Sequence, residues 1–216
     1  MELNDIVQGS SEWHELRLGK ITASNLANVL AVGRSGGESL TRIKYKNDLV
    51  RERLTHKYVE GYINAAMERG TALEPLARAS YEVKYNVLVD QIAFIDHPYI
   101  SNSGCSPDGL VGDDGLIEIK VRNPSNHLAS FLDDGKELRQ KYYTQTQWQM
   151  ACMPERKWVD LVSFDPDMDM DLQLFVIRIP RDEEFIKMAE EAAMAFNDEI
   201  TTTILKLKEI KNGNNT

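Results

Sequence analysis

The spacing of hydrophobic positions changes several times along this chain. In the first 85 residues, apolar side chains recur three and four positions apart, the spacing of amphipathic helices. From residue 87, short runs rich in β-branched and aromatic residues indicate strands. Helical spacing returns after Pro124, and two further strands precede a final helix. This order predicts a single domain of the α/β (α+β) class, with a central mixed β-sheet flanked by helices.

Residues that cap or end helices give approximate bounds for these elements. The first helix is expected to begin at Ser10 or Ser11 and to end at Gly19, and a second to begin at Thr22 or Ser24. Further helices are predicted over 40–57, 64–85, 125–132, 136–153 and 181–211, strands over 87–96, 99–105, 157–164 and 172–179, one domain over 1–211, and a disordered tail over 212–216.

The stretch 104–121, GCSPDGLVGDDGLIEIKV, holds the most informative local pattern. Residues 112–114 predict a three-residue hairpin loop, which would place Asp108 opposite Glu118 on the paired strand. Because side chains alternate between the two faces of a strand, the isoleucines beside Glu118 point into a core. Glu118 and Lys120 then share the other face with Asp108.

This grouping suggests a metal site. Two carboxylates on one face repel each other at neutral pH unless a cation lies between them. A site made only of oxygen ligands suits a hard ion such as Mg²⁺. A lysine one step further along can hold or deprotonate a water that faces a phosphate. The hairpin alone leaves open a surface turn with three unrelated charges, because a D…ExK pattern often occurs by chance.

Other polar residues could join this site from neighbouring helices. Glu74, in the helix before the strands, is a third acid within possible reach. Gln145 and Gln147 lie on the helix after the hairpin, and glutamine near a metal can orient a water or bind a phosphate oxygen. The alternative for all three is an ordinary solvated helix face.

A second candidate site lies near the N-terminus. Arg17 offers a guanidinium fork, and Thr22 and Ser24 offer hydroxyl groups at a predicted helix start. Together with free backbone N–H groups, these would suit a terminal phosphate. The alternative is plain helix capping, which Thr and Ser perform without a ligand.

Charge and composition limit the possible classes. The 216 residues carry a net charge of −9, which argues against a protein that binds nucleic acid over its whole surface. The charge is uneven: residues 34–57 carry seven basic and three acidic side chains, whereas residues 160–199 carry twelve acidic and three basic ones. This asymmetry is compatible with a basic patch on an acidic body.

No segment suggests export or membrane insertion. No run approaches the ~20 apolar residues of a spanning helix, and the first ten residues lack the basic and apolar regions of a secretory signal. Cys105 and Cys152 form no CxxC motif and are expected to be reduced and packed, in a cytosolic setting. A zinc or iron–sulfur site is not expected.

Five motifs occur in the order found in a known family. They are EWHELRLGKITAS at 12–24, RGTALE at 69–74, CSPDGL at 105–110, LIEIK at 116–120 and YTQTQ at 143–147. With these motifs the chain resembles the lambda-exonuclease-like (YqaJ) viral recombinases of the PD-(D/E)XK nuclease superfamily, over about residues 10–179. It departs at 121–124, VRNP, where relatives often have Cys-Pro, and this affects only local loop contacts.

The resemblance implies a restriction-endonuclease-like PD-(D/E)XK fold and a metal-dependent exonuclease. The substrate would be double-stranded DNA, digested 5′→3′ from a 5′-phosphorylated end, with release of 5′-mononucleotides and a 3′ single-stranded overhang. Two Mg²⁺ ions per active site are expected, with Mn²⁺ as a substitute. The expected partners are two further copies in a homotrimer ring and a single-strand annealing protein, in phage-type recombination in the cytoplasm of a bacterial host.

The same resemblance implies roles for particular residues. Asp108 would bridge the metal ions, and Glu118 with the Ile119 backbone carbonyl would complete one metal site. Glu74 would support the other, and Lys120 would position the attacking water.

Gln145 would orient a water or a phosphate oxygen. The residues expected to bind the 5′-phosphate or the DNA are Arg17, Thr22, Ser24, Arg34 and Gln147. Two alternatives remain at this stage: a site-specific endonuclease of the same superfamily, and a non-catalytic DNA-end-binding protein.

Overall fold

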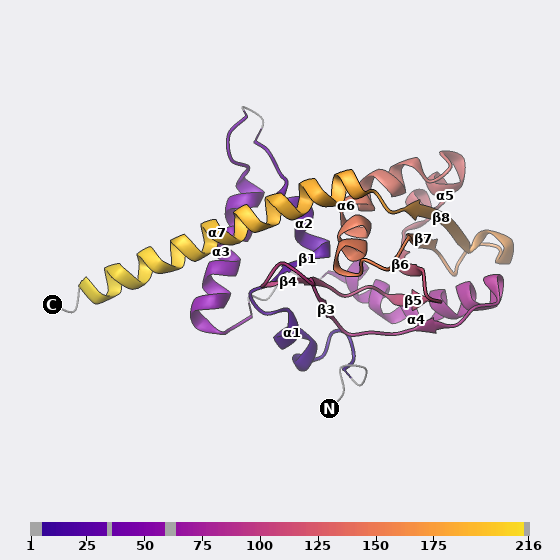
Figure 1. Cartoon of the computed structure of the whole chain (residues 1–216). Helices are drawn as coiled ribbons and strands as arrows, with labels where there is room; N and C mark the ends of the chain where they lie inside the picture. Colours follow the sequence, from indigo (N-terminus) through magenta and orange to yellow (C-terminus); the bar gives the residue numbers. More distant parts are fainter. Residues whose placement is uncertain (1–5, 34–35, 59–63, 214–216) are drawn as a thin grey trace.

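The computed structural model describes residues 6–33, 36–58 and 64–213. Five strands form the larger sheet, in the order β2-β5-β6-β7-β8, and three short strands form a second sheet, β1-β4-β3 (Figure 1). In the larger sheet β6 and β7 are parallel and the other neighbours are antiparallel. The predicted fold class, a mixed sheet flanked by helices, is confirmed.

The bounds of the elements are as follows. The strands are β1 (Ile21–Thr22), β2 (Val89–Asp90), β3 (Ile95–Asp96), β4 (Ser103–Cys105), β5 (Gly109–Val111), β6 (Gly115–Val121), β7 (Trp158–Phe164) and β8 (Leu174–Pro180). The helices are α1 (Ser11–Arg17), α2 (Leu26–Val29), α3 (Leu40–Thr55), α4 (Ala65–Tyr85), α5 (Pro124–Leu132), α6 (Lys136–Cys152) and α7 (Glu183–Gly213), with 3₁₀ turns at Ala23–Asn25 and Met170–Leu172.

The β5–β6 hairpin has the predicted register. Val111 pairs with Gly115, so residues 112–114 form a three-residue loop, and Gly112 has the positive φ of 53° that such a loop uses. Continuing the register by one pair places Asp108 opposite Glu118.

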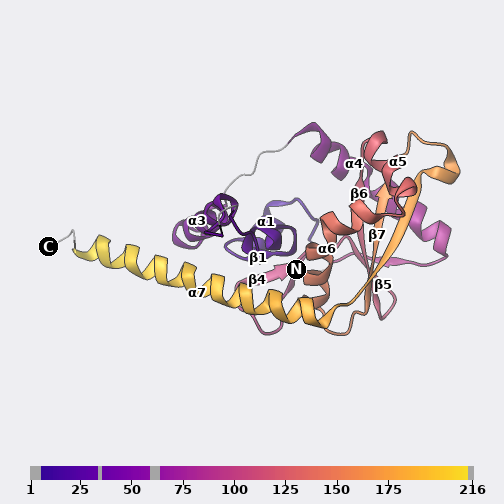
Figure 2. The same cartoon turned by 90° about the horizontal axis from the view of Figure 1, so that it is seen from above.

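Helices cover both faces of the central strand β6. On one face, Ile117 and Ile119 pack with Ala77 and Tyr81 of α4. On the other face, Leu116 joins a second cluster that includes residues of α6. Figure 2 shows α4 and α6 on the two sides of this sheet. Side chains of β6 that face α6 are therefore shielded from bulk water, and this shielding governs the chemistry described below.

The strand predicted over 87–96 is wrong in its extent. The chain forms two short strands there, because β2 pairs with β5 in the larger sheet whereas β3 pairs with β4 in the smaller one. A segment that passes from one sheet to the other cannot keep one register. The strand predicted over 99–105 is also shorter, because Asn102 has a positive φ of 53° and only β4 follows it.

Most helix bounds lie within a few residues of the predicted ones. Ser10 caps α1 through the Trp13 N–H. α5 begins one residue before the predicted range and is capped by Asn123, with Pro124 in its first turn, where a missing N–H costs nothing. α7 includes Asn212 and Gly213 of the predicted tail, and the rest of that tail lies outside the described residues. Within the described chain, no helix has the length and apolar character needed to cross a membrane.

Candidate active site

The structure brings Asp108, Glu118 and Lys120 together at one end of the β5–β6 hairpin. The Lys120 Nζ lies 2.5 Å from Glu118 Oε1, and Asp108 Oδ2 accepts a 2.6 Å hydrogen bond from the Ile119 N–H. β5 begins only at Gly109, so the Asp108 side chain satisfies a backbone donor just beyond the paired residues. Glu118 is only 2% exposed.

Two glutamines of α6 hold the Glu118 carboxylate. Gln145 Nε2 donates to Oε1 at 2.6 Å, and Gln149 Nε2 donates to Oε2 at 2.5 Å. The sequence prediction included Gln145 but missed Gln149. Gln149 could have been predicted from the sequence, because residues four apart lie on the same face of a helix and Gln149 therefore faces the same side as Gln145.

Burial controls the charges in this cluster. Burial, together with the negative charges of Glu118 and Glu74, raises the pKa of Asp108 well above its usual value. Burial alone would lower the pKa of Lys120, but the carboxylates of Glu118 and Asp108 outweigh it and raise that pKa. Lys120 is therefore firmly cationic, and its Nζ also lies 4.6 Å from the centre of the Tyr142 ring.

Glu74 lies beside this cluster, on α4. Burial raises its pKa, and the Glu118 charge adds to the rise, while Arg78 and Lys120 oppose it. Its Oε1 lies 2.5 Å from the Arg78 guanidinium. Glu74 is thus electrostatically coupled to the hairpin carboxylates, with an arginine as its direct partner.

The donor set fits a hard divalent cation in part. Across the described residues, no three His, Cys, Asp or Glu side chains converge closely enough to hold an ion unaided. Asp108 and Glu118 form a pair, however, and Asp108 Oδ1 has no hydrogen-bond partner within the described chain. Mg²⁺ usually takes one or two carboxylates and completes its shell with water and substrate phosphate, so this arrangement is suitable for it.

The second candidate site is built around Arg17, at the end of α1. Its guanidinium donates to Ser106 Oγ at 3.1 Å and to Ser24 Oγ at 3.5 Å, and lies 4.2 Å from the centre of the Trp13 ring. Trp13 Nε1 also donates to Ser106 Oγ, at 3.0 Å. Burial lowers the pKa of Arg17, but an arginine remains charged at neutral pH. Ser106 was missed from the sequence, because it approaches Arg17 from a distant segment. Trp13 was also missed, although it lies four residues before Arg17 on α1 and therefore on the same helix face.

Helix capping does not account for Thr22 and Ser24. Neither the 3₁₀ turn after Thr22 nor α2 has a side-chain capping hydrogen bond. Thr22 Oγ1 instead accepts from Asn25 Nδ2 at 3.1 Å and lies 3.4 Å from Ser24 Oγ. Thr22 is buried and Ser24 is exposed, so the Ser24 hydroxyl is the one that faces solvent beside Arg17.

Two further residues were predicted to contact DNA, Arg34 and Gln147. Arg34 lies outside the described residues. Gln147 is fully buried: its Nε2 donates to the Pro180 carbonyl at 2.8 Å, and its Oε1 accepts from the Asp182 N–H at 2.9 Å. The amide thus binds α6 to the end of β8 and to the residue before α7, and its burial leaves it no exposed surface for a DNA contact in this structure.

A model of the YqaJ-like viral recombinase domain matches residues 12–154, well over half of the chain. The chain belongs to this family. The match covers Arg17 and the Asp108–Glu118–Lys120 cluster, so both candidate sites lie within the YqaJ-like domain. Comparison with curated proteins gives no match.

Solved structures agree with this assignment. The alkaline exonuclease LHK-Exo from Laribacter hongkongensis is 42% identical, with a TM-score of 0.85 over 94% of this chain and 99% of that one. LHK-Exo in complex with dAMP is 41% identical, with a TM-score of 0.86 over the same shares. A phage-related exonuclease from Haemophilus somnus 129PT, at 17% identity and a TM-score of 0.67 over 88% of this chain and 99% of that one, shares the fold. The chain is therefore an exonuclease-type nuclease of a recombinase family.

Proposed function

We propose that this YqaJ-like protein is a Mg²⁺-dependent 5′→3′ exonuclease on double-stranded DNA, which prefers 5′-phosphorylated ends, releases 5′-mononucleotides and leaves a 3′ overhang. One observation carries the proposal. Ser106, which contacts Arg17, is two residues before Asp108 in the chain. Two residues span at most ~7 Å, so one terminal nucleotide could contact the phosphate pocket and the carboxylates together.

The carboxylates supply the metal ligands in this proposal. Asp108, Glu118 and the Ile119 carbonyl would hold the two expected Mg²⁺ ions, with support from Glu74. When bound, the ions would polarise the scissile phosphate and activate water. Mn²⁺ is expected to substitute for Mg²⁺, because both accept oxygen ligands.

Lys120 and Gln145 would act on the reacting groups. The cationic Lys120, half-buried beside Glu118, would steady the negative charge that develops on the phosphate and would position the attacking water. Gln145 already donates to Glu118, and its placement at the same carboxylate would let it orient a water or a phosphate oxygen.

Arg17 and Ser24 would bind the 5′-phosphate, with Ser106 and Thr22 holding them in place. A partly buried guanidinium favours an anion, because it has already lost part of its hydration. The capture of dAMP by LHK-Exo is in keeping with a deoxynucleoside monophosphate product. Arg34 stays a proposed DNA contact by its position in the glycine-rich loop.

The expected setting is phage-type recombination in a bacterial cytoplasm. We expect a homotrimer ring, because a ring needs positive charge only on its inner wall and so accommodates the net charge of −9. The 3′ strand that digestion leaves would be the substrate of a single-strand annealing protein.

The test compares DNA substrates that differ only at their ends. With Mg²⁺, linear 5′-phosphorylated duplex should release mononucleotides, 5′-hydroxyl duplex should do so more slowly, and a covalently closed circle should stay intact. Cutting of the circle would indicate an endonuclease. Binding of linear DNA without any mononucleotide release would indicate an end-binding protein, and either result would overturn the proposal.

A further inference from the structure

The C-terminal part of α7 extends beyond the body of the molecule. Figures 1 and 2 both show its last turns projecting without another element beside them. Phe196 and Ile200 of this helix are fully buried. The same helix face continues with Leu207 and Ile210, which are 43% and 59% exposed. An apolar stripe that stabilises the fold near Phe196 is thus exposed about three to four turns further along the helix.

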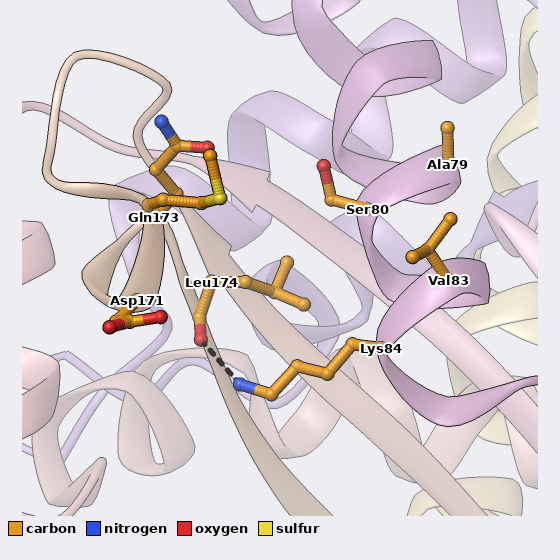
Figure 3. Close-up of a pocket in the computed structure, with 8 residues that line it drawn as sticks. Ala79, Ser80, Val83, Lys84, Asp171, Gln173 and Leu174 are labelled. Atoms are coloured by element: carbon orange, nitrogen blue, oxygen red, sulfur yellow. Dashed lines mark hydrogen bonds between the residues drawn. The ribbon is translucent and has the colours of Figure 1, made fainter.

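A groove lies at the opposite end of the molecule, between α4 and the connection from β7 to β8 (Figure 3). Its lining includes the apolar side chains of Val83, Met170 and Leu174. Val83 and Met170 are 84% and 87% exposed, so the groove offers open apolar surface at its rim. An exposed apolar surface of this kind commonly marks an interaction site.

The end of α7 and the connection beside the groove carry opposite charges, and Lys84, which also lines the groove, donates to the Leu174 carbonyl. The end of α7, from Leu205 to Lys211, has three lysines, Lys206, Lys208 and Lys211, and one glutamate. The connection beside the groove, DPDMDMD at 165–171, has four aspartates and no basic residue. Within the described part of the chain, Asp169 and Asp171 make no ion pair, and neither do the three lysines. Each surface therefore has unpaired charge that the other could neutralise.

We infer that the α7 end of one copy of this chain docks in the α4/β7–β8 groove of a second copy. Leu207 and Ile210 would cover Val83 and Met170, while the lysines face Asp169 and Asp171. The two surfaces differ and lie at opposite ends, so the contact is head-to-tail, and such contacts close into rings when the rotation permits. The inference goes beyond the proposed ring by assigning its two contact surfaces, and it does not depend on the catalytic residues.

The experiment is a charge swap read by native mass spectrometry and sedimentation equilibrium. Variant one carries Lys206→Glu, Lys208→Glu and Lys211→Glu, and variant two carries Asp169→Lys and Asp171→Lys. Each should raise the dissociation constant of the assembly about tenfold or more, because like charges then meet at the contact. The chain that combines both sets should assemble again, since the charges are opposite once more. Folding should be unaffected, because all five side chains are exposed.

Matched controls separate the contact from a general charge effect. A control variant with Lys187→Glu and Lys44→Glu changes exposed lysines elsewhere on α7 and on α3. It should form an assembly of the same number of copies as the wild type. Wild-type protein that stays monomeric at micromolar concentration would overturn the inference, as would a combined variant that fails to reassemble. Lysine variants that keep their assembly but bind duplex DNA more weakly would assign these lysines to DNA instead. Mass is the readout, so a protein without nuclease activity would disprove the proposed function and leave this test intact.

Discussion

The two candidate sites are built in different ways. The proposed catalytic cluster of Asp108, Glu118 and Lys120 belongs to one hairpin, and the register of that hairpin follows from a three-residue loop. The proposed phosphate pocket brings together Arg17 from α1 and Ser106 from the segment after β4, which lie at opposite ends of the N-terminal half of the chain. The first site is local in sequence and enclosed by helices, whereas the second is non-local and partly open. We expect loss of a residue in the first to stop chemistry, and loss of a residue in the second to change which ends are used.

The largest expected effect is at Glu118. Glu118→Gln keeps the shape of the side chain but removes the charge that faces Lys120 and the proposed metal. Mononucleotide release from a 5′-phosphorylated duplex should fall by at least about 10³-fold, while circular dichroism shows a folded protein. Turnover close to that of the wild type would remove Glu118 from the mechanism.

Lys120→Ala comes next. The cation that would meet developing charge is lost, so kcat should fall by about 10²- to 10³-fold, with little change in DNA binding measured by fluorescence anisotropy. An unchanged kcat would show that Lys120 only neutralises Glu118.

A substitution of Gln149 tests whether the α6 glutamines that hold the Glu118 carboxylate contribute to metal binding and catalysis. Gln149→Leu leaves Glu118 Oε2 without its 2.5 Å donor, so Mn²⁺ affinity and kcat should each fall by about 10- to 100-fold. Gln147→Leu is the matched control on the same helix, because its amide bonds only backbone groups. It should lower the melting temperature and leave Mn²⁺ affinity unchanged. Equal metal affinity in both variants would mean that Gln149 does not position Glu118.

Arg17→Ala addresses the open pocket. A charge-assisted contact is worth roughly 1.5–3 kcal/mol, so the preference for 5′-phosphorylated over 5′-hydroxyl duplex should shrink by about 10- to 100-fold. Digestion of the hydroxyl substrate should change little. Equal slowing on both substrates would make Arg17 a general DNA contact or a structural residue.

The smallest effect at neutral pH is expected at His97, which supports the turn before β4. Its Nδ1 accepts the N–H groups of Tyr99 and Ile100, both at 3.2 Å, and its Nε2 lies 3.2 Å from Glu190 Oε1 without hydrogen-bond alignment. Burial lowers the pKa of His97 to about 4. The folded state therefore favours the neutral ring, and its contribution to stability is complete above the unfolded pKa of about 6.5 and is lost as pH falls towards 4.

His97→Gln should flatten that part of the stability curve. Urea unfolding of the wild type between pH 7 and pH 4 should show a loss on the order of 2–3 kcal/mol from this group, and the variant should show less. The same slope in both proteins would place the titration elsewhere.

The contrast between the sites also explains what could be predicted from sequence. Alternation along one strand and a short loop were enough to place Asp108 opposite Glu118, because both rules act over a few residues. Ser106 could not be placed beside Arg17, because that contact depends on how α1 packs against the segment after β4. Trp13 could have been placed there, because it lies four residues before Arg17 on α1. Gln149 could have been found from its four-residue spacing to Gln145, whereas Gln147, two residues away, points elsewhere on α6.

Strand bounds failed for the same reason. Residues 87–96 have one continuous strand-like pattern, yet β2 and β3 belong to different sheets. Local composition cannot reveal a change of partner. The sequence predicts that the end of α7 is helical. Only the packed structure shows that the apolar side of this helix extends beyond the rest of the molecule.

The most direct test of the account is calorimetric titration of Mn²⁺ into the metal-free wild type and into Asp108→Asn. One oxygen of Asp108 accepts a hydrogen bond from the Ile119 N–H, and the other has no partner in the described chain. The negative charges of Glu118 and Glu74 help to raise the pKa of Asp108. The account predicts saturable Mn²⁺ binding to the wild type and loss of at least the tighter site in the variant, with the fold retained. Identical titration curves for the two proteins would contradict it, because the hairpin carboxylates would then not form the metal centre.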